Sequence, residues 1–377
     1  MSKKRIILFL ACALCFAPLM NGVFFASPAQ AGEIPDWVSN TKLIGDFRFR
    51  YQNEDNVYSK VDKTDEMDRE RWRIRLRFGL ETAPNDQWTV GFGIASGSDD
   101  PRSTNQTMEN FFETPDARLD YAYTTWKPME NIALTAGKFK NPIWNPKDLL
   151  WDSDIMPNGL TGNFNIKASD TFKFFITPSF FILDEYKDEA LDDEDEPTVN
   201  HPEDDPSMVA LQAGTKMDFN KTVGATLGVT YYKFNNTQDV AFFQGEEDAS
   251  SWSVEAEAGI ESLPVYIGII GQYVVSDADD DETGYLVGAV CGDKKIKDLW
   301  DWQVKYSFRR LEEYAWWDQL PDADFLGGDT GLKGSKVELA MGLHKNVNIG
   351  INYVTSEYLV GNKDQDIVQV DLNVKFP

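Results

Sequence analysis

The most distinctive chemical feature of this chain is a row of arginines at alternate positions. Arg71, Arg73, Arg75 and Arg77 are separated by apolar or aromatic residues. In an extended strand alternate side chains share one face, so the four guanidinium groups would form one line of positive charge. Four arginines buried in a dry core would be costly, whereas a face turned toward water carries them at little cost. Fixed charges in water orient polar solutes, so the row predicts that solutes are selected by their charge and polarity.

Residues suited to catalysis are scarce. Covalent or acid–base catalysis needs an activated nucleophile or a general base. The two histidines are His201, beside prolines in an acidic segment, and His344, at a predicted turn. Neither has a partner Ser or Asp at an informative position, and Asp152-Ser153-Asp154 lacks a histidine or a Gly-rich loop beside it. The sequence therefore predicts no catalytic residue, cofactor or metal site, and an enzyme is only the rival class.

The closing segment 365–376 shows how the arginines are positioned. Apolar and polar residues alternate there without a break, which is the pattern of a strand with one oily and one wet face. The same pattern recurs along the chain in sixteen segments. They are 43–53, 69–82, 88–97, 116–127, 132–140, 160–167, 171–183, 208–219, 222–234, 251–261, 264–275, 284–291, 300–310, 334–343, 346–356 and 365–376.

The connections between these segments alternate in length. Long polar loops such as 54–68 and 98–115 are followed by tight turns such as Pro84-Asn85-Asp86. Connections 276–283 and 292–299 are less distinct in length. Long loops on one side and short turns on the other are typical of outer-membrane barrels, and an even strand number places both termini on the short-turn side.

The fold class predicted is all-β, a transmembrane antiparallel barrel of about sixteen strands. A soluble β-sandwich also alternates, and its exposed face would tolerate arginines, so the row favours a barrel without excluding a sandwich. Sixteen strands leave a water-filled channel, whereas eight are filled by side chains. Strands of about 9–11 residues cross the membrane, although no segment after the N-terminus approaches the roughly 18 apolar residues of a membrane helix.

The N-terminus resembles an export signal. Lys3, Lys4 and Arg5 precede an apolar run, which closes with Ala29-Gln30-Ala31. This predicts a cleaved signal peptide at residues 1–31 and a single barrel domain at 32–377. A single membrane anchor or lipoprotein processing at Cys12 or Cys15 fits the pattern less well. Cleavage leaves Cys291 alone, which excludes an intramolecular disulfide.

Composition narrows the partners further. The formal net charge is −26, with 62 acidic against 36 basic residues. So acidic a surface is a poor partner for nucleic acid or an anionic membrane. Aromatic residues make up 13% of the chain, which suits strands that end in interfacial aromatic girdles.

Several ordered strings resemble the bacterial putative porin family of sixteen-stranded outer-membrane barrels. They are Gly45-Asp46-Phe47-Arg48-Phe49-Arg50, 71–80, Ala95-Ser96-Gly97, 103–107, 119–123, 136–142 and 150–154. The likeness is dense from about 43 to 165 and returns in the closing strand. It differs in ending Phe376-Pro377, because such barrels usually finish on the aromatic residue. The resemblance implies a porin of the bacterial outer membrane, passing small hydrophilic solutes and ions by passive diffusion.

Two walls are expected to form a constriction. The basic wall is pore-lining and consists of Arg48, Arg50, Arg71, Arg73, Arg75, Arg77 and Arg118. The opposing wall is the third long loop, Asn141 to Gly159. General porins fold their third long loop into the lumen, and the same placement is expected here by analogy. Its acidic residues are Asp148, Asp152 and Asp154, and its aromatics Trp144 and Trp151 would pin it to the inner wall. The alternative is an ordinary surface loop. A field between the walls would orient polar solutes.

The remaining expectations concern partners. The acidic run 188–196 and the aspartates at 277 and 279–281 are solvated loops or, alternatively, bind Ca²⁺ or Mg²⁺ that bridges to lipopolysaccharide. The barrel class implies outer-membrane lipid and the barrel-assembly machinery as partners, and a homotrimer follows by analogy with general porins. The alternative function is a structural or adhesive barrel with a plugged lumen, which bilayer conductance would distinguish from a porin.

Overall fold

The computed structural model describes residues 36–58, 66–185, 205–238, 240–243, 246–261, 265–361 and 363–376. The chain divides into a unit that ends at Asn40 and a unit that begins at Thr41. The first unit contains the short helix α2 (Asp36–Ser39), and the second contains all strands of the described residues. The signal peptide expected at residues 1–31 lies outside the described residues. Within the described ranges no helix is long and apolar enough to cross a membrane.

The second unit is built from one antiparallel sheet. Its strands are β1 (Lys42–Tyr58), β2 (Glu66–Asn85), β3 (Trp88–Ala95), β4 (Gln106–Thr107), β5 (Arg118–Met129), β6 (Ile132–Lys138), β7 (Asn158–Lys167), β8 (Phe172–Ile182), β9 (Ser207–Asp218), β10 (Val223–Asn235), β11 (Ala249–Ile260), β12 (Tyr266–Ser276), β13 (Thr283–Gly292), β14 (Trp302–Leu311), β15 (Leu332–His344), β16 (Val347–Tyr358) and β17 (Asp364–Lys375). Two 3₁₀ turns, η1 (Ala241–Phe243) and η2 (Leu326–Gly328), lie in the connections.

The sheet closes on itself. β1 pairs with β2 on one side and with β17 on the other, and each remaining long strand pairs with its neighbours in the chain. The two-residue β4 pairs with β2 beyond the end of β3, so sixteen strands form the wall. All sixteen predicted segments coincide with these strands. The barrel prediction is confirmed, and the sandwich alternative fails because the ring leaves no second sheet.

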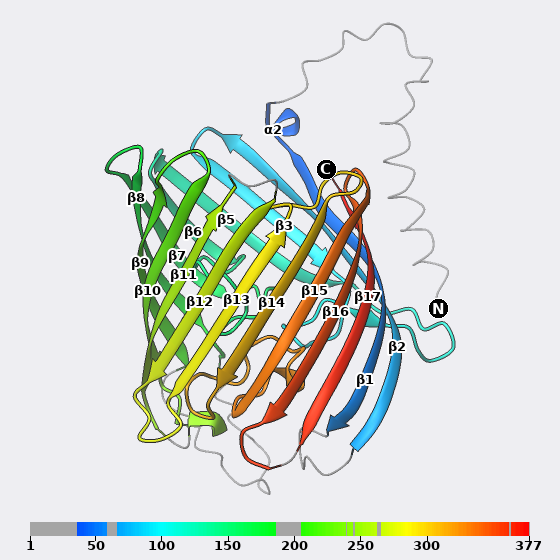
Figure 1. Ribbon diagram of the computed structural model, residues 1–377. Helices are drawn as coiled ribbons and strands as arrows, with labels where there is room; N and C mark the ends of the chain where they lie inside the picture. The colour runs from blue at the N-terminus through cyan, green and yellow to red at the C-terminus, as the bar shows by residue number, and fades with distance from the viewer. Residues whose placement is uncertain are drawn as a thin grey trace, which may run out of the picture. The chain divides into compact units, whose positions relative to one another are not determined.

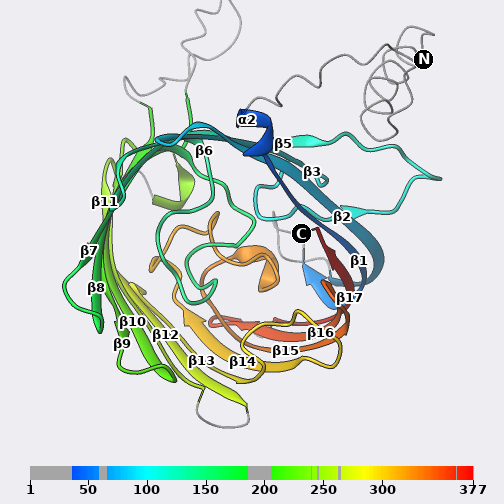
Figure 2. The same cartoon turned by 90° about the horizontal axis from the view of Figure 1, so that it is seen from above.

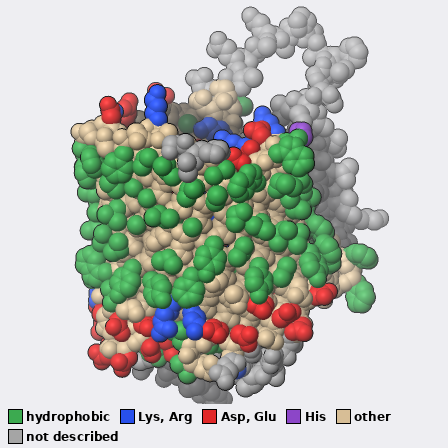
Figure 3. Space-filling view, viewed as in Figure 1, with side chains coloured by type: hydrophobic (Ala, Val, Ile, Leu, Met, Phe, Trp, Pro, Cys, Tyr) green, Lys and Arg blue, Asp and Glu red, His purple; other side chains and the backbone are tan. Residues whose placement is uncertain are grey.

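Apolar side chains cover the outside of the barrel. On β16, Ile351 and Tyr353 are exposed, whereas the alternate residues Gly350 and Asn352 face the interior cavity. Figure 3 shows the result on one face: a broad hydrophobic band with charged side chains gathered at the two rims. A band of this kind matches the hydrocarbon layer that a barrel must face.

The connections divide between the two rims (Figure 1). One rim carries the short turns, such as 86–87, 130–131 and 345–346, and the C-terminal end of β17. The other rim carries the long loops, including 96–117, 139–157 and 312–331. One pair departs from the rule, because the turn 293–301 is longer than the loop 277–282 on the opposite rim. This is the pair whose lengths were indistinct in the sequence.

Two loops fill part of the interior. Loops 139–157 and 312–331 fold into the barrel (Figure 2). They meet inward-facing apolar side chains of β8 to β14, among them Phe181, Tyr232 and Leu286. Burying apolar surface stabilises this arrangement in the same way as in a soluble protein core. The large interior cavity lies mainly along β15, β16, β17, β1 and β2.

Candidate functional site

The arginine row lies inside the barrel. A cavity of about 1860 Å³ runs along β1 and β2 and is lined by six of the seven expected arginines. They are Arg48, Arg50, Arg71, Arg73, Arg75 and Arg77. The antiparallel register sets Arg48 opposite Arg75 and Arg50 opposite Arg73, so the two strands form a ladder of guanidinium groups, called the arginine ladder below.

Arg118 does not line this cavity. Its guanidinium donates to the backbone carbonyls of Asp100, at 2.9 Å, and Ser103, at 3.0 Å. It also donates to the carbonyl of Ser98. Arg118 therefore fixes the path of the loop between β3 and β5. Sequence alone could not separate it from the ladder, because both kinds of arginine begin or continue a strand.

Carboxylates placed on the neighbouring strands offset the like charges of the ladder. Arg50 makes a bidentate pair with Asp371 of β17, with distances of 2.7 and 2.8 Å. Arg75 and Arg77 share Asp46 of β1, each at 2.7 Å. Like charges directly opposite each other destabilise a sheet, and these hydrogen-bonded ion pairs reverse that penalty locally.

Two members of the ladder depend mainly on neutral partners. Arg73 donates to Gln52 at 3.3 Å, to the Ser103 hydroxyl at 3.2 Å and to the Asn105 carbonyl at 3.1 Å. Arg48 donates to Asn373 at 3.1 Å, and its distance to the Asp371 carboxylate is 3.8 Å. The positive charge of these two guanidinium groups is therefore less neutralised by nearby carboxylates than that of Arg50 and Arg75.

Loop 139–157 enters the barrel and is anchored through both of its expected aromatic residues. Trp151 is 5% exposed, packs edge-on against Phe181 and Trp316, and places its indole nitrogen 3.4 Å from the Tyr232 hydroxyl. Trp144 is anchored through its backbone. Its N–H donates to the Gln212 side chain at 2.8 Å, and its carbonyl accepts from the same amide at 2.9 Å.

The three expected loop carboxylates all line the cavity, and they have different partners. Asp154 contacts the ladder, where Arg77 donates to it at 3.2 Å and the Thr104 hydroxyl at 2.9 Å. Burial alone would raise the pKa of Asp154, but Arg75, Arg77 and Thr104 outweigh burial and hold the pKa below its ordinary value. Asp154 therefore stays ionised beside the ladder.

Asp148 and Asp152 also line the cavity, but their partners lie outside the ladder. Asp148 pairs with Arg309 of β14. Asp152 accepts the Ala323 N–H of loop 312–331 at 3.2 Å, so it joins the two loops. The irregular path of the loop separates these residues, and no periodicity in the sequence could have predicted it.

Loop 312–331 is the part of the site that the sequence reading did not identify. Asp322, Asp324 and Leu326 line the cavity, and Lys336 of β15 bridges the two aspartates at 2.9 and 2.8 Å. A signal was present, because Trp316, Trp317, Leu320 and Phe325 are too apolar for a connection that faces only water. Trp316 and Phe325 are indeed buried.

The other candidate residues lie at the periphery or outside the described residues. The acidic run 188–196 and His201 fall in the undescribed range 186–204. His344 ends β15 and is exposed. Asp277 accepts hydrogen bonds from the Ser250 backbone and hydroxyl, the latter at 2.8 Å. Among the residues that the structure describes, no group of three or more His, Cys, Asp or Glu side chains is arranged to hold a metal ion.

Several solved structures share this architecture. OprB of Pseudomonas putida aligns with a TM-score of 0.58 at 11% identity, over 90% of this chain and 95% of that chain. OmpF of Salmonella typhi, solved with daunomycin, aligns with a TM-score of 0.54 at 12% identity, over 90% of this chain and 99% of that chain. The outer membrane channel DcaP of Acinetobacter baumannii aligns with a TM-score of 0.50 at 15% identity, over 89% of this chain and 97% of that chain. At these identities the likeness establishes the fold. No curated protein sequence matches the chain.

The closed barrel with its apolar belt and charged interior cavity, together with a family model that matches the chain, defines a channel protein of the bacterial outer membrane. The family model described as "Putative porin" matches residues 52–260 and 253–376, which together span most of the barrel. The chain therefore belongs to the putative porin family. Family and fold favour a channel over an enzyme, and they do not favour a plugged structural barrel.

Proposed function

We propose that this channel passes small hydrophilic solutes and ions by passive diffusion, and that the arginine ladder and Asp154 form its charge filter. The observation that carries the proposal is the cavity along β1 and β2, which six of the expected arginines and Asp154 line together. Opposed charges across a narrow aqueous path orient polar solutes and set ion selectivity.

The ladder can serve as a filter because it is held rigidly. Arg50, Arg75 and Arg77 are each fixed by a carboxylate on an adjacent strand or loop. Arg48 and Arg73 lie between them and keep weaker or neutral partners. Arginines whose charge is only partly neutralised can bind anionic or polar groups weakly at several successive positions. Weak binding lets a solute leave again.

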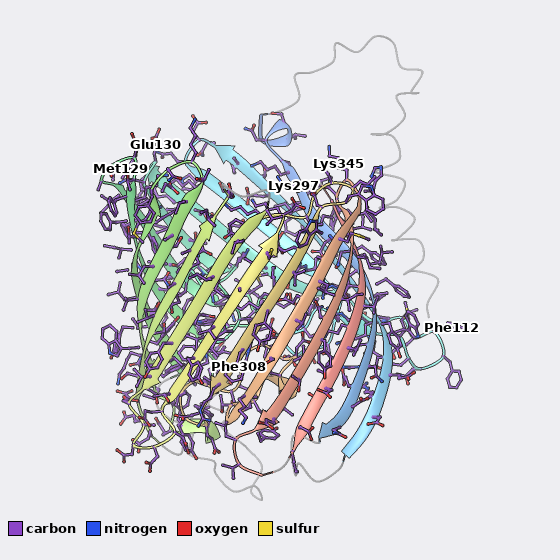
Figure 4. The ribbon with its side chains drawn as sticks, viewed as in Figure 1. Phe112, Met129, Glu130, Lys297, Phe308 and Lys345 are labelled. Carbon is purple, nitrogen blue, oxygen red and sulfur yellow. The ribbon has the colours of Figure 1, made fainter. Side chains whose placement is uncertain are left out.

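Planar-bilayer recording tests the filter. In the ladder variant, Arg71, Arg73, Arg75 and Arg77 are all changed to glutamine. The control variant changes four exposed turn lysines to glutamine and removes the same charge: Lys294, Lys295, Lys297 and Lys345. Figure 4 places Lys297 and Lys345 at the short-turn rim, and none of the four lines the cavity.

The ladder variant should shift the reversal potential in a salt gradient toward cation selectivity, because positive charge leaves the path. The control variant should keep the wild-type value. An unchanged reversal potential in a ladder variant that still conducts would remove the ladder from the filter. A conducting channel with no solute uptake in liposome swelling would contradict the diffusion proposal.

The partners proposed for the barrel are outer-membrane lipid with lipopolysaccharide, the barrel-assembly machinery and two further copies in a homotrimer. Support for a trimer comes from the outer wall at β3 and β6, the shortest strands after β4. A shallow apolar groove of about 560 Å³ lies there, bordered by Trp88, Trp126 and Leu160. Light scattering of the detergent-solubilised protein should give three times the mass of one chain.

A further inference from the structure

We propose that loop 312–331 is a second constriction loop, which closes a ring around the solute path together with loop 139–157. The inference rests on the proposed function only in assuming that solutes pass through the cavity beside the arginine ladder. It adds that the narrow part is bounded by two loops. Three links, each made of hydrogen bonds, join the loops to each other and to the barrel wall.

The first link joins loop 139–157 to β2. The Arg77 guanidinium donates to Asp154 at 3.2 Å, and the same carboxylate accepts from the Thr104 backbone at 3.1 Å and the Thr104 hydroxyl at 2.9 Å. Asp154 is buried, so this contact is shielded from bulk water. Charge-assisted hydrogen bonds of this kind are about twice as strong as neutral ones.

The second link joins the two loops. Asp152 accepts the Asp154 N–H at 2.8 Å with one oxygen and the Ala323 N–H at 3.2 Å with the other. Its own N–H donates to the Leu320 carbonyl at 2.6 Å. Asp152 thus contacts loop 312–331 on both sides of the aspartate at 322, and the loops move as one body unless these bonds break.

The third link joins loop 312–331 to β15 and β17. Lys336 donates to Asp322 and Asp324, and the Gln369 amide donates to Asp324 at 2.8 Å. β17 lies beside β1 in the sheet, with Asp371 opposite Arg50. The sequence of contacts therefore returns through β17 and β1 to β2, where it began.

Loop 312–331 is packed firmly on the side away from the cavity. The Trp316 indole donates to the Leu150 carbonyl at 2.6 Å and lies edge-on to Trp151. The Arg309 guanidinium stacks 3.7 Å from the ring centre of Phe325, a favourable cation–π contact. A loop fixed by buried aromatics keeps its inner edge in one place, as a size filter requires.

The inner edge of the loop borders the water-filled space. Residues 322–324 and 326–327 line the cavity, as do Ser153 and Asp154 from the other loop and Arg48 and Arg50 from the wall. The cavity also reaches residues near both rims, from Lys42 to Gln365. A solute that travels along this cavity passes the ring, so loop 312–331 limits its size.

A cysteine at Ala323 tests the ring without removing the loop. Ala323 lines the cavity, is half-buried, and changes little in size when replaced by cysteine. The background variant Cys291→Ala removes the native thiol that the described chain contains. The control is Ala278→Cys in the same background, because Ala278 lies in the loop 277–282 and does not line the cavity.

Both variants are treated with a sulfonate-bearing methanethiosulfonate, and labelling is verified by mass. Labelled Ala323→Cys should lose roughly a third or more of its single-channel conductance, because a blocked constriction dominates the resistance of a pore. Labelled Ala278→Cys should conduct as before. Full labelling at position 323 with unchanged conductance would overturn the proposal. A position 323 that resists the reagent while position 278 reacts would overturn it too.

A deletion provides the opposite change. Replacing residues 318–329 with a short Gly-Ser linker should raise conductance roughly twofold or more, because the width of the narrowest point sets the current. It should also admit larger sugars in liposome swelling. Unchanged conductance and size limit in a conducting deletion variant would contradict the second constriction. If the ladder variant keeps its reversal potential while the Ala323→Cys block is observed, the charge filter fails and the two-loop ring stands.

Discussion

Ile351 and Asn352 are neighbours on β16, and their side chains face opposite surroundings. Ile351 is 43% exposed on the outer surface, whereas Asn352 lines the interior cavity and donates to Gln369 at 3.1 Å. One step along the strand thus separates the apolar belt from the aqueous path. This adjacency gives a matched pair of positions for testing which side of the barrel faces lipid.

Arginine should be tolerated at one of these positions only. Ile351→Arg should lower the free energy of unfolding by about 2–4 kcal/mol, the cost of a cation on the lipid face near the bilayer midplane. Asn352→Arg should leave stability almost unchanged and shift ion selectivity toward anions. Denaturant titration in lipid vesicles measures the first effect and bilayer recording the second. Equal stability losses at the two positions would contradict the assignment of the faces.

The strands could be predicted because their pattern is local. Alternation in the closing segment required no knowledge of its partners, and β17 was found where it was expected, at Asp364–Lys375. The short segment predicted at 160–167 is β7, at Asn158–Lys167. A strand with lipid on one side and water on the other carries the signal in its own residues. Closure of the ring then followed from the even count and the alternating connection lengths.

The interior could be predicted only in part, because distant contacts decide it. Tyr231 and Tyr232 are consecutive aromatics, yet one packs against the outer Trp252 and the other is fully buried under Trp316. Whether loop 312–331 turns inward depends on Lys336 and Gln369, which follow it in the sequence. Apolar residues in that connection were the one local indication of burial.

Trp151 should contribute strongly to the docking of loop 139–157. Trp151→Ala removes its packing against Phe181 and Trp316 and the hydrogen bond to Tyr232. The expected loss is about 3–5 kcal/mol, typical of a large aromatic deleted from a packed interior. Unfolding in denaturant, followed by circular dichroism in detergent, measures the loss.

Trp300→Ala is the control for this experiment. Trp300 is 69% exposed in the turn between β13 and β14, so its removal leaves no cavity in the interior. Its effect should stay within about 0.5 kcal/mol, as for most surface substitutions. Similar losses for both variants would show that the barrel is stable without a packed loop 139–157.

The contact between the two loops should weaken as the pH rises. Burial raises the pKa of Asp152 to about 9, and the nearby carboxylates of Asp322 and Asp154 act in the same direction. Burial likewise raises the pKa of Asp322 to about 6, although Lys336 and Arg309 oppose it. Docked loops therefore hold protons that undocked loops release near the ordinary value of 3.8. The contribution of Asp152 and Asp322 to docking is complete below that value and is progressively lost up to about pH 9.

Two neighbouring carboxylates act in the opposite sense on the acidic side. Burial alone would raise the pKa of Asp148 and of Asp324. Lys147 and Arg309 outweigh it at Asp148, and Lys336 and Arg50 outweigh it at Asp324, so both values lie below the ordinary range. Their contribution is complete above pH 4 and is lost only in stronger acid. Between pH 6 and 9 the change in docking should therefore come mainly from Asp152.

A buried cysteine reports this change. Leu320→Cys, in the Cys291→Ala background, places a thiol between the docked loops, where Leu320 is 7% exposed. Its labelling rate is compared with that of the same cysteine combined with Asp152→Asn, which carries no charge at any pH and keeps one of the two acceptor oxygens. The rate with aspartate at position 152 is divided by the rate with asparagine there, so the ionisation of the thiol itself cancels. This ratio should rise from pH 6 to 9, by up to about tenfold per pH unit, because one proton is involved. A ratio that stays constant across this range would show that Asp152 does not hold the loops together through its proton.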